Sequence, residues 1–476
     1  MQTMQTIRRT LAAEAAVLVA LALLTVRDGA AQTSAFATLY NFKGDTDGAS
    51  PNGATLGKNG ALYGTTYAGG SNKTCSGNLC GTVFELTPVK GAAWTKTVLH
   101  DFSGGDGAWP SPSLIGAPGP SLVFGSNGAL YGTTAAGGTA APPSFGGTVF
   151  ALTPPAGAGG VWTESVLYNL NGSPDAPNTP LGGLFVGPSG AIYGTAENSF
   201  FVGGGDGGGS ETGGSVFVLT PPAPAGGSWT QRTLVNFYPP SALGLQPLSA
   251  LVSLGGSLYG TTYLQGSYGG CGSVYALSPP ATKGAAWTGT ATYTFSGNDG
   301  CYSLAPLTLG PGGILYGTTY GGGTGTCSFG EYDGCGTVFQ LTPPATAGGP
   351  WTETVIYNFT ALNGDGAHPV GGVVLAKNGV LYGTTTNGGS AVSGSPCIGY
   401  GGGYGYGPIG CGTVFQLTPP ATPSAAWTET ILHNFTGENG EGSIPGPLTM
   451  NADGVLFGPS WTGGTAGKGT IFAIQP

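Results

Sequence analysis

The sequence predicts an all-β protein, a seven-bladed β-propeller of four-stranded antiparallel blades. Three recurring phrases carry this prediction. The first, which begins as Leu62-Tyr63-Gly64-Thr65-Thr66, occurs seven times with a mean period of roughly 66 residues. A second, Gly-Thr-Val-Phe-x-Leu-Thr, and a third, which starts at a Trp and ends at a Phe, recur between its copies. The period suits four short strands per unit. The aromatic residue of the first phrase is Tyr63, Tyr131, Tyr193, Tyr259, Tyr316, Tyr382 and Phe457.

Each unit predicts its strands in the same order, as the second unit illustrates. The expected strands are Pro110–Ile115, Ala129–Thr134, Gly147–Thr153 and Trp162–Leu170. Asn127-Gly128 favours a tight hairpin turn between the first two, because both residues tolerate positive φ. Pro154-Pro155 ends the third, because proline cannot donate to a strand ladder. The fourth strand is apolar on both faces, which is typical of sheets covered on both sides, as stacked propeller blades are.

The count of strands predicts how the ring closes. The chain ends directly after the seventh third strand, Gly469–Ile474, so the last unit lacks its own fourth strand. Near the N-terminus, Phe36–Phe42 matches the fourth strands of the other units. We therefore expect it to pair with the last blade and cover its exposed edge.

The N-terminal segment predicts export. Arg8 and Arg9 precede the apolar stretch Leu11–Val26, and Gly29-Ala30-Ala31 resembles a cleavage site, so residues 1–31 read as a signal peptide and residues 32–476 as one propeller domain. A membrane-spanning helix is the alternative, which Glu14 disfavours. The formal net charge of −9 argues against a nucleic-acid partner. We expect a secreted, extracellular or periplasmic monomer without a transmembrane anchor after cleavage.

The pairing of Leu-Tyr-Gly-Thr-Thr with Gly-Thr-Val-Phe-x-Leu-Thr-Pro resembles the Gloeobacter/Verrucomicrobia tandem repeat of exported bacterial "choice-of-anchor" proteins. The resemblance covers essentially the whole mature chain. It implies little about activity, because that group is defined by its repeat and by surface sorting. Nothing after Ile474 resembles a sorting helix.

The eight cysteines predict four disulfides, because an even number behind an export signal favours oxidation. Three pairs lie within loops between second and third strands: Cys75 with Cys80, Cys327 with Cys335, and Cys397 with Cys411. That leaves Cys271, in a similar loop, and Cys301, which follows the fourth strand of the same unit. In a meander these two loops emerge on one face, so the pair can meet. Zinc is the alternative, but Cys75 and Cys80 lack a second ligand pair, and we expect no metal at the thiols.

Acids recur in the turns after the fourth strands, at Asp47, Asp106, Asp175, Asp299, Asp365 and Glu441 among others. A ring of calcium ligands is one interpretation. The favoured interpretation is that each acid satisfies its own turn. His100 and His433 occupy a slot otherwise filled by tyrosines and are interpreted as packed strand residues, while His368 could act as an acid or base. We expect no cofactor, with calcium left open.

The loops on the disulfide-bearing face are the candidate functional region. They vary in length and carry aromatic residues that could stack on sugar rings or anchor a protein. The selected ligand-binding residues are Tyr400, Tyr404, Tyr406, Tyr332 and Trp109. The alternative is that each ring covers its own loop. The sequence thus favours a non-catalytic binding scaffold for an extracellular glycan or protein. The competing class is a propeller hydrolase or lyase acting on polysaccharide through acids such as Glu331, Asp333 and Asp365.

Overall fold

The structure is a computed structural model. It describes residues 34–72, 74–75, 80–110, 122–139, 146–157, 159–170, 179–197, 213–223, 226–239, 241–265, 270–282, 284–327, 334–346, 348–390, 397, 410–422, 425–438 and 440–476. The predicted signal peptide, residues 1–31, lies outside the described residues.

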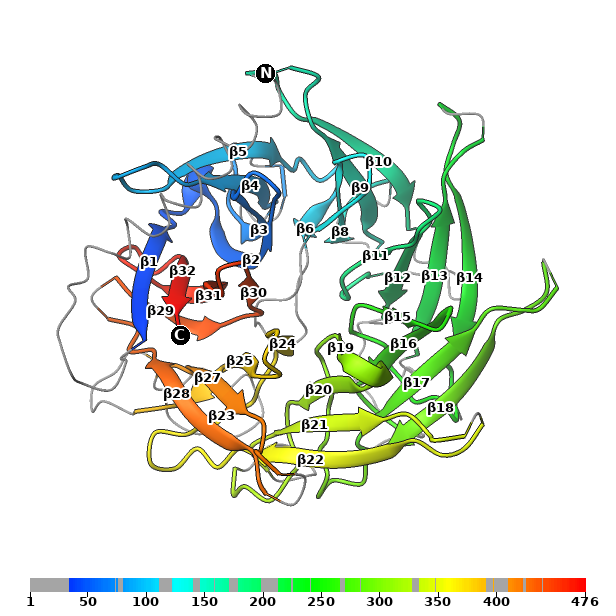
Figure 1. Ribbon diagram of the computed structural model, residues 1–476. Coiled ribbons are helices and arrows are strands. Elements are labelled where there is room, and N and C mark those ends of the chain that lie inside the picture. Colours follow the sequence, from blue (N-terminus) through cyan, green and yellow to red (C-terminus); the bar gives the residue numbers. More distant parts are fainter. Residues whose placement is uncertain are drawn as a thin grey trace, which may run out of the picture.

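Within these residues the strands form seven antiparallel sheets of four or five strands arranged in a ring, plus one two-stranded sheet (Figure 1). This is the predicted seven-bladed propeller. In blades 1 to 6 the first strand lies toward the centre of the ring and the fourth forms the outer rim, and in blade 7 β30 lies toward the centre and β1 at the rim (Figure 1).

The first three blades follow the predicted meander. Blade 1 comprises β2 (Ala49–Leu56), β3 (Leu62–Ala68), β4 (Thr82–Thr87) and β5 (Thr95–Asp101), preceded by the short 3-10 turn η1 (Asp45–Asp47). Blade 2 comprises β6 (Ala108–Pro110), β7 (Leu122–Phe124), β8 (Leu130–Ala136), β9 (Thr148–Thr153) and β10 (Thr163–Asn169). Blade 3 comprises β11 (Phe185–Val186), β12 (Ile192–Ala196), β13 (Ser215–Thr220) and β14 (Thr230–Asn236).

The next three blades repeat this order. Blade 4 comprises β15 (Val252–Leu254), β16 (Ser257–Thr262), β17 (Ser273–Ser278) and β18 (Thr288–Thr294). Blade 5 comprises β19 (Thr308–Leu309), the 3-10 turn η3 (Pro311–Gly313), β20 (Leu315–Thr319), β21 (Thr337–Thr342) and β22 (Thr352–Asn358). Blade 6 comprises β24 (Val373–Leu375), β25 (Leu381–Thr385), β27 (Thr413–Thr418) and β28 (Thr428–Asn434), with the small sheet of β23 (Gly366–Ala367) and β26 (Asn387–Gly388).

Blade 7 closes the ring with strands from both ends of the chain. It contains β29 (Gly442–Pro445), β30 (Thr449–Met450), β31 (Leu456–Gly463) and β32 (Thr470–Gln475), and β1 (Ala35–Asn41) pairs antiparallel with β32. The register runs from Ala35 opposite Gln475 to Asn41 opposite Thr470. The predicted closing strand is thereby confirmed, and β32 has no free edge.

The repeated phrases recur because they contact one another within each blade. A Cβ on Gly64 would lie 2.6 Å from Cζ of Phe84, so only glycine fits against that ring. The hydroxyl groups of Thr66 and Thr82 lie 2.9 Å apart on the same two strands. These contacts join the first phrase to the second. The contact of glycine with an aromatic ring returns in every blade, and the hydroxyl pair returns in blades 2, 4, 5 and 6, as with Thr319 and Thr337.

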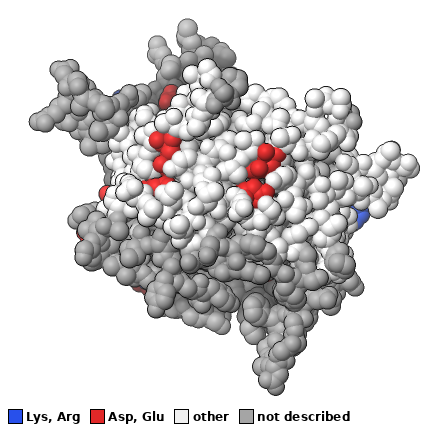
Figure 2. Space-filling view, turned by 90° about the horizontal axis from the view of Figure 1, so that it is seen from below, with Lys and Arg blue, Asp and Glu red and all other residues white. Residues whose placement is uncertain are grey.

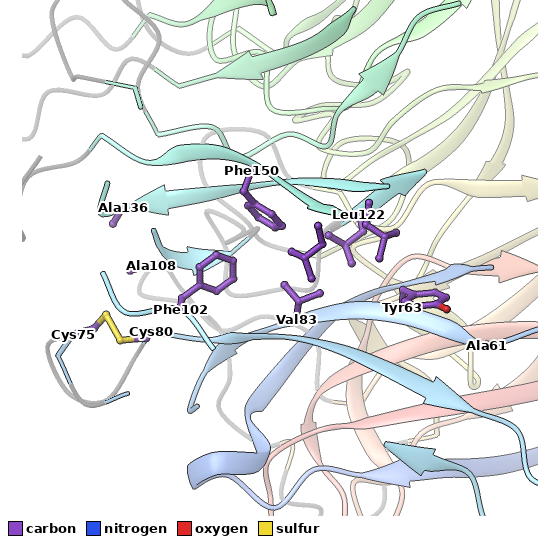
Figure 3. Packing of buried hydrophobic residues seen from close by; sticks show 12 residues of the cluster. Ala61, Tyr63, Cys75, Cys80, Val83, Phe102, Ala108, Leu122, Ala136 and Phe150 are labelled. Carbon is purple, nitrogen blue, oxygen red and sulfur yellow. A yellow bond between two sulfur atoms is a disulfide. The ribbon is translucent and has the colours of Figure 1, made fainter. Parts of the chain in front are cut away.

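The core lies between neighbouring blades. At six of the seven blade junctions a Phe that follows the outer strand packs edge-on against an aromatic residue of the next blade, as Phe102 does against Phe150 with ring centroids 5.2 Å apart. After the outer strand of blade 2 the buried Leu170 takes this position. Figure 3 shows this cluster between blades 1 and 2, with Val83 and Leu122 beside the two rings and Tyr63 at the far end of the cluster. Inter-blade packing of large apolar side chains is therefore what holds the ring together.

The surface carries little charge. Figure 2, which looks at the side of the ring where β22 and β28 lie in Figure 1, shows acidic side chains in two separate groups on an otherwise almost uncharged face. Among the described residues, no helix is long and apolar enough to cross a bilayer.

Candidate functional site

The loops between second and third strands and those that lead into the next blade share one face, which we call the loop face. The structure contains all four predicted disulfides there: Cys75–Cys80, Cys271–Cys301, Cys327–Cys335 and Cys397–Cys411. Four of these cysteines occupy one repeat position, directly before the glycine that opens the third strand: Cys80, Cys271, Cys335 and Cys411. The bridge of Cys271 to Cys301 agrees with the meander topology that predicted it.

At the inner start of each blade on this face, one residue that is not glycine adopts a left-handed backbone. These seven residues are Ser50, Trp109, Thr179, Gln246, Tyr302, His368 and Ile444, with φ between 47° and 64°. Six of them precede a proline, which ordinarily favours extended backbone in the residue before it. For β-branched residues such as Thr179 and Ile444 this conformation is strained. Such strain persists only where surrounding contacts hold it, and it is often found at functional sites.

Hydrogen bonds from the preceding blade fix this conformation. The backbone N–H of Trp109 donates to the carbonyl of Cys80, and those of Tyr302 and His368 donate to the carbonyls of Cys271 and Cys335. Ile444 donates in the same way to Cys411. The acceptor is thus the disulfide cysteine itself in four blades. The disulfides therefore brace the loops that hold the strained residues in place.

The residue that directly follows each copy of the first phrase, at or near the end of the second strand, lies against these positions, and together the two sets form a ring of side chains that we call the inner ring. The second set is Tyr67, Ala135, Glu197, Tyr263, Tyr320, Thr386 and Trp461. Tyr67 lies between Trp109 and Trp461, with ring centroids 6.3 and 5.4 Å away. Elsewhere in the inner ring, Tyr263 stacks on Tyr302 with ring centroids 4.9 Å apart.

The inner ring also contains polar members. Gln246 donates through Nε2 to Glu197 Oε1 at 2.8 Å, and both side chains are buried. Tyr320 stacks on His368 at 4.5 Å, and His368 Nδ1 lies 3.3 Å from Asn387 Oδ1. Burial lowers the pKa of His368 to about 4, so the imidazole is neutral at physiological pH. It is therefore a packed polar group and not a titrating acid or base near neutral pH.

A cavity of about 280 Å³ opens beside the inner ring at the junction of blades 6 and 7, and we call it the 6–7 pocket. Its polar lining is neutral and includes Thr386, Asn387, Ser443 and Thr462, while glycines form much of the remainder. Ser443 Oγ and Thr462 Oγ1 lie 2.7 Å apart, and Thr386 Oγ1 donates to Asn387 Oδ1 at 3.0 Å. Hydroxyl and amide groups held in this way can exchange hydrogen bonds with the hydroxyl groups of a ligand.

The turn acids satisfy their own turns, as the favoured interpretation predicted. Asp106 Oδ1 accepts from the backbone N–H and the hydroxyl of Ser103 at 2.8 and 3.0 Å. Asp365 accepts from both groups of Thr360 in the same way. Each acid also meets an aromatic side chain of its outer strand, so that Tyr293 donates to Asp299 at 2.6 Å.

A second carboxyl group from the neighbouring outer strand approaches three of these acids. Burial, with the nearby charge of Asp299 as a smaller cause, raises the pKa of Glu353 to about 7. Burial and the charge of Asp365 raise the pKa of Glu429 to about 7. Burial and Asp106 likewise raise the pKa of Glu164 to about 7, against the opposing effect of His100. Because two carboxyl groups meet at three blade junctions on the outer rim, this pairing by itself does not mark one active site.

Of the residues selected from the sequence, Trp109 lies in the inner ring, half-buried. It packs in the cluster between blades 1 and 2 and is not a freely exposed ring. Tyr332, Tyr400, Tyr404 and Tyr406 lie outside the described residues, as do Asp175, Glu331 and Asp333. The structure does show that Cys397 and Gly410, within the long loop of Tyr400, line the 6–7 pocket.

Sequence reasoning missed the inner ring, although a signal was present. A proline follows the strained residue in six units, at Pro51, Pro110, Pro180, Pro247, Pro369 and Pro445. The residues before these prolines differ widely in chemistry, which is unusual for a repeat position that only packs. Variable side chains on a fixed backbone are typical of a recognition surface.

Comparisons with solved structures return proteins of several activities at low similarity. A polysaccharide lyase, Uly1, is 9% identical with a TM-score of 0.44 and covers 94% of this chain and 93% of its own. A gluconolactonase of Xanthomonas campestris is 13% identical with a TM-score of 0.37, covering 73% of this chain and 85% of its own. The NanB sialidase of Streptococcus pneumoniae is 11% identical with a TM-score of 0.38, covering 92% and 70%. Similarity at this level says nothing about activity.

No curated protein matches the chain. The Gloeobacter/Verrucomicrobia repeat matches residues 25–200 and 117–396, which together span most of the sequence. The chain therefore belongs to the Gloeobacter/Verrucomicrobia repeat family.

Proposed function

We propose that this protein is an exported, non-catalytic scaffold that binds a neutral extracellular glycan in the 6–7 pocket and across the adjacent inner ring. The observation that carries the proposal is the pocket itself. Its uncharged hydroxyl and amide groups suit sugar hydroxyls. Trp461, the neighbour of the pocket residue Thr462 in the sequence, adds a half-buried aromatic side chain next to those groups.

The negative net charge of the chain favours a neutral glycan over an acidic one. A formal net charge of −9 repels polyanionic chains, and no described residue lining the pocket is basic. A neutral glycan meets no such penalty. Export is supported by the four disulfides and by a repeat family of exported proteins. The proposal includes the prediction that residues 1–31 are a signal peptide that directs export.

Hydrolysis or elimination by paired acids receives less support. Glycosidases place two carboxyl groups on either side of one sugar-binding cleft. Here the described carboxyl pairs lie at the outer rim, as with Glu353 beside Asp299, and they repeat at several junctions. Within the inner ring the sole described carboxyl group is Glu197, which accepts from Gln246.

A glycan array probed with the purified mature protein tests the proposal. We expect retention of one or more neutral oligosaccharides, and loss of at least tenfold in affinity for the variant S443A/T462V. The matched control is S257A/S278A, which removes a hydroxyl pair 3.1 Å apart at the hairpin end of blade 4, away from the pocket. Equal affinity of both variants would exclude the pocket. Detection of cleavage products from a retained glycan would show that the protein is an enzyme and would contradict the proposal of a non-catalytic scaffold.

A further inference from the structure

Three side chains that can bind a metal ion, one imidazole and two carboxyl groups, meet between blades 1 and 2. None of them lines the 6–7 pocket. His100 comes from β5, Asp106 from the turn that follows, and Glu164 from β10 of the next blade. His100 Nε2 lies 3.0 Å from Asp106 Oδ2, and one donor atom from each residue lies within 4.8 Å of the others. All three side chains are half-buried. Glu164 Oε1 is buried without a hydrogen-bond partner among the described residues.

The corresponding junction between blades 7 and 1 already contains a cation. There Lys96 stands at the position of Glu164, and its Nζ lies 3.2 Å from Asp47 Oδ1 and donates to the Asp47 carbonyl. The ammonium also lies 5.3 Å from the ring centre of Phe42. The turn acid of the repeat thus holds a positive charge in the same inter-blade space. Between blades 1 and 2 the lysine is replaced by an acid, and no described Lys or Arg forms an ion pair with Asp106 or Glu164.

We propose that His100, Asp106 and Glu164 form a binding site for one divalent transition-metal ion, with Zn²⁺ as the best-suited ion. One imidazole nitrogen and two carboxylate oxygens are ligands that zinc accepts, with water in the fourth position. Calcium and magnesium prefer oxygen ligands alone, so the imidazole disfavours them. Ligand atoms about 2.0–2.2 Å from a tetrahedral ion lie about 3.3–3.6 Å apart. His100 Nε2 and Asp106 Oδ2 are already this close, whereas the donor atoms of the set lie up to 4.8 Å apart, so zinc would draw the Glu164 carboxylate inward by up to about 1.2 Å.

The other junctions show why this one is distinct. Tyr293 and Tyr357 occupy the position of His100 beside their own acid pairs, and a protonated phenol is a poor metal ligand. At the junction of blades 6 and 7, His433 lies 3.7 Å from Glu441, but Phe36 stands where Glu164 does and stacks on the imidazole at 3.8 Å. Only at the junction of blades 1 and 2, among those described, do the imidazole and both carboxyl groups come together.

Titration calorimetry of the untagged, chelator-treated mature protein with Zn²⁺ tests the site. We expect one ion per chain, and a tetrahedral absorption band when Co²⁺ replaces Zn²⁺. The variant H100Y installs the residue found in four other units, and E164Q keeps the shape of Glu164; each should weaken binding at least tenfold. The control H433Y removes an imidazole that lacks a third ligand and should bind like the native protein.

Two results would overturn the proposal. The first is no zinc binding by the native protein at micromolar concentrations. The second is native affinity in a folded H100Y/E164Q double variant, which would place the ion elsewhere. Circular dichroism and the thermal midpoint of the metal-free variants distinguish loss of the site from loss of folding. If H100Y alone fails to fold, E164Q and the Co²⁺ spectrum still decide the question.

Discussion

Substituting Phe42 by Ala probes the closure of the ring. Phe42 follows β1, is fully buried and packs edge-on against Phe84 of blade 1 with ring centroids 5.2 Å apart. Its side chain therefore joins the N-terminal strand, which completes blade 7, to the first blade. Removing a buried Phe side chain costs about 3–5 kcal/mol through lost burial and the cavity left behind. We expect a loss in this range, because the rigid β-sheets on either side limit collapse of the cavity.

Denaturant unfolding of the mature protein with intact disulfides, followed by tryptophan fluorescence, measures this loss. The matched control is Leu362→Ala, a truncation at a side chain that is 58% exposed, where a change within about 0.5 kcal/mol is expected. A loss of less than about 1 kcal/mol for Phe42→Ala would refute the reasoning, since closure would then not depend on this contact.

Three further predictions follow from the same structure. Because the pKa of both Glu353 and Glu429 is raised from 4.5 to about 7, their contribution to stability is complete below about pH 4.5 and is lost as the pH rises through 7. The thermal midpoint of the native protein should therefore fall relative to that of E353Q/E429Q between pH 5 and 8, and parallel curves would contradict the shifts. Removing the Cys271–Cys301 bridge, which joins residues 30 positions apart, should cost about 3.6 kcal/mol by chain entropy, against about 2.1 kcal/mol for Cys75–Cys80 with a separation of 5. Alanine pairs at each bridge, compared by denaturant midpoint, test this order. Replacing Tyr400, Tyr404 and Tyr406 by Ser should weaken retention on the glycan identified by the array without a large change in thermal midpoint. Unchanged retention would mean that these three side chains take no part in binding and that the loop only covers the surface.

The sequence by itself determined the architecture, because each copy of the repeat corresponds to one blade and the number of copies therefore gives the number of blades. Seven copies of the phrase at Tyr63 gave the number of blades, and the missing last strand located its replacement at Phe36–Phe42. The cysteine pairing followed for the same reason, since a meander places Cys271 and Cys301 on one face. These inferences need only the order of strands, which backbone pairing and alternation fix locally.

The tertiary structure alone decided which side chains meet between blades. Trp109 and Tyr67 are 42 positions apart and belong to different blades, so no local pattern predicts that their rings face each other. The same holds for His100 and Glu164, whose approach depends on the angle between neighbouring sheets. The left-handed backbone at His368 also escaped prediction, because local preferences before proline oppose it and a hydrogen bond to the previous blade at Cys335 enforces it. Inter-blade contacts thus override local propensity at the positions where the candidate sites lie.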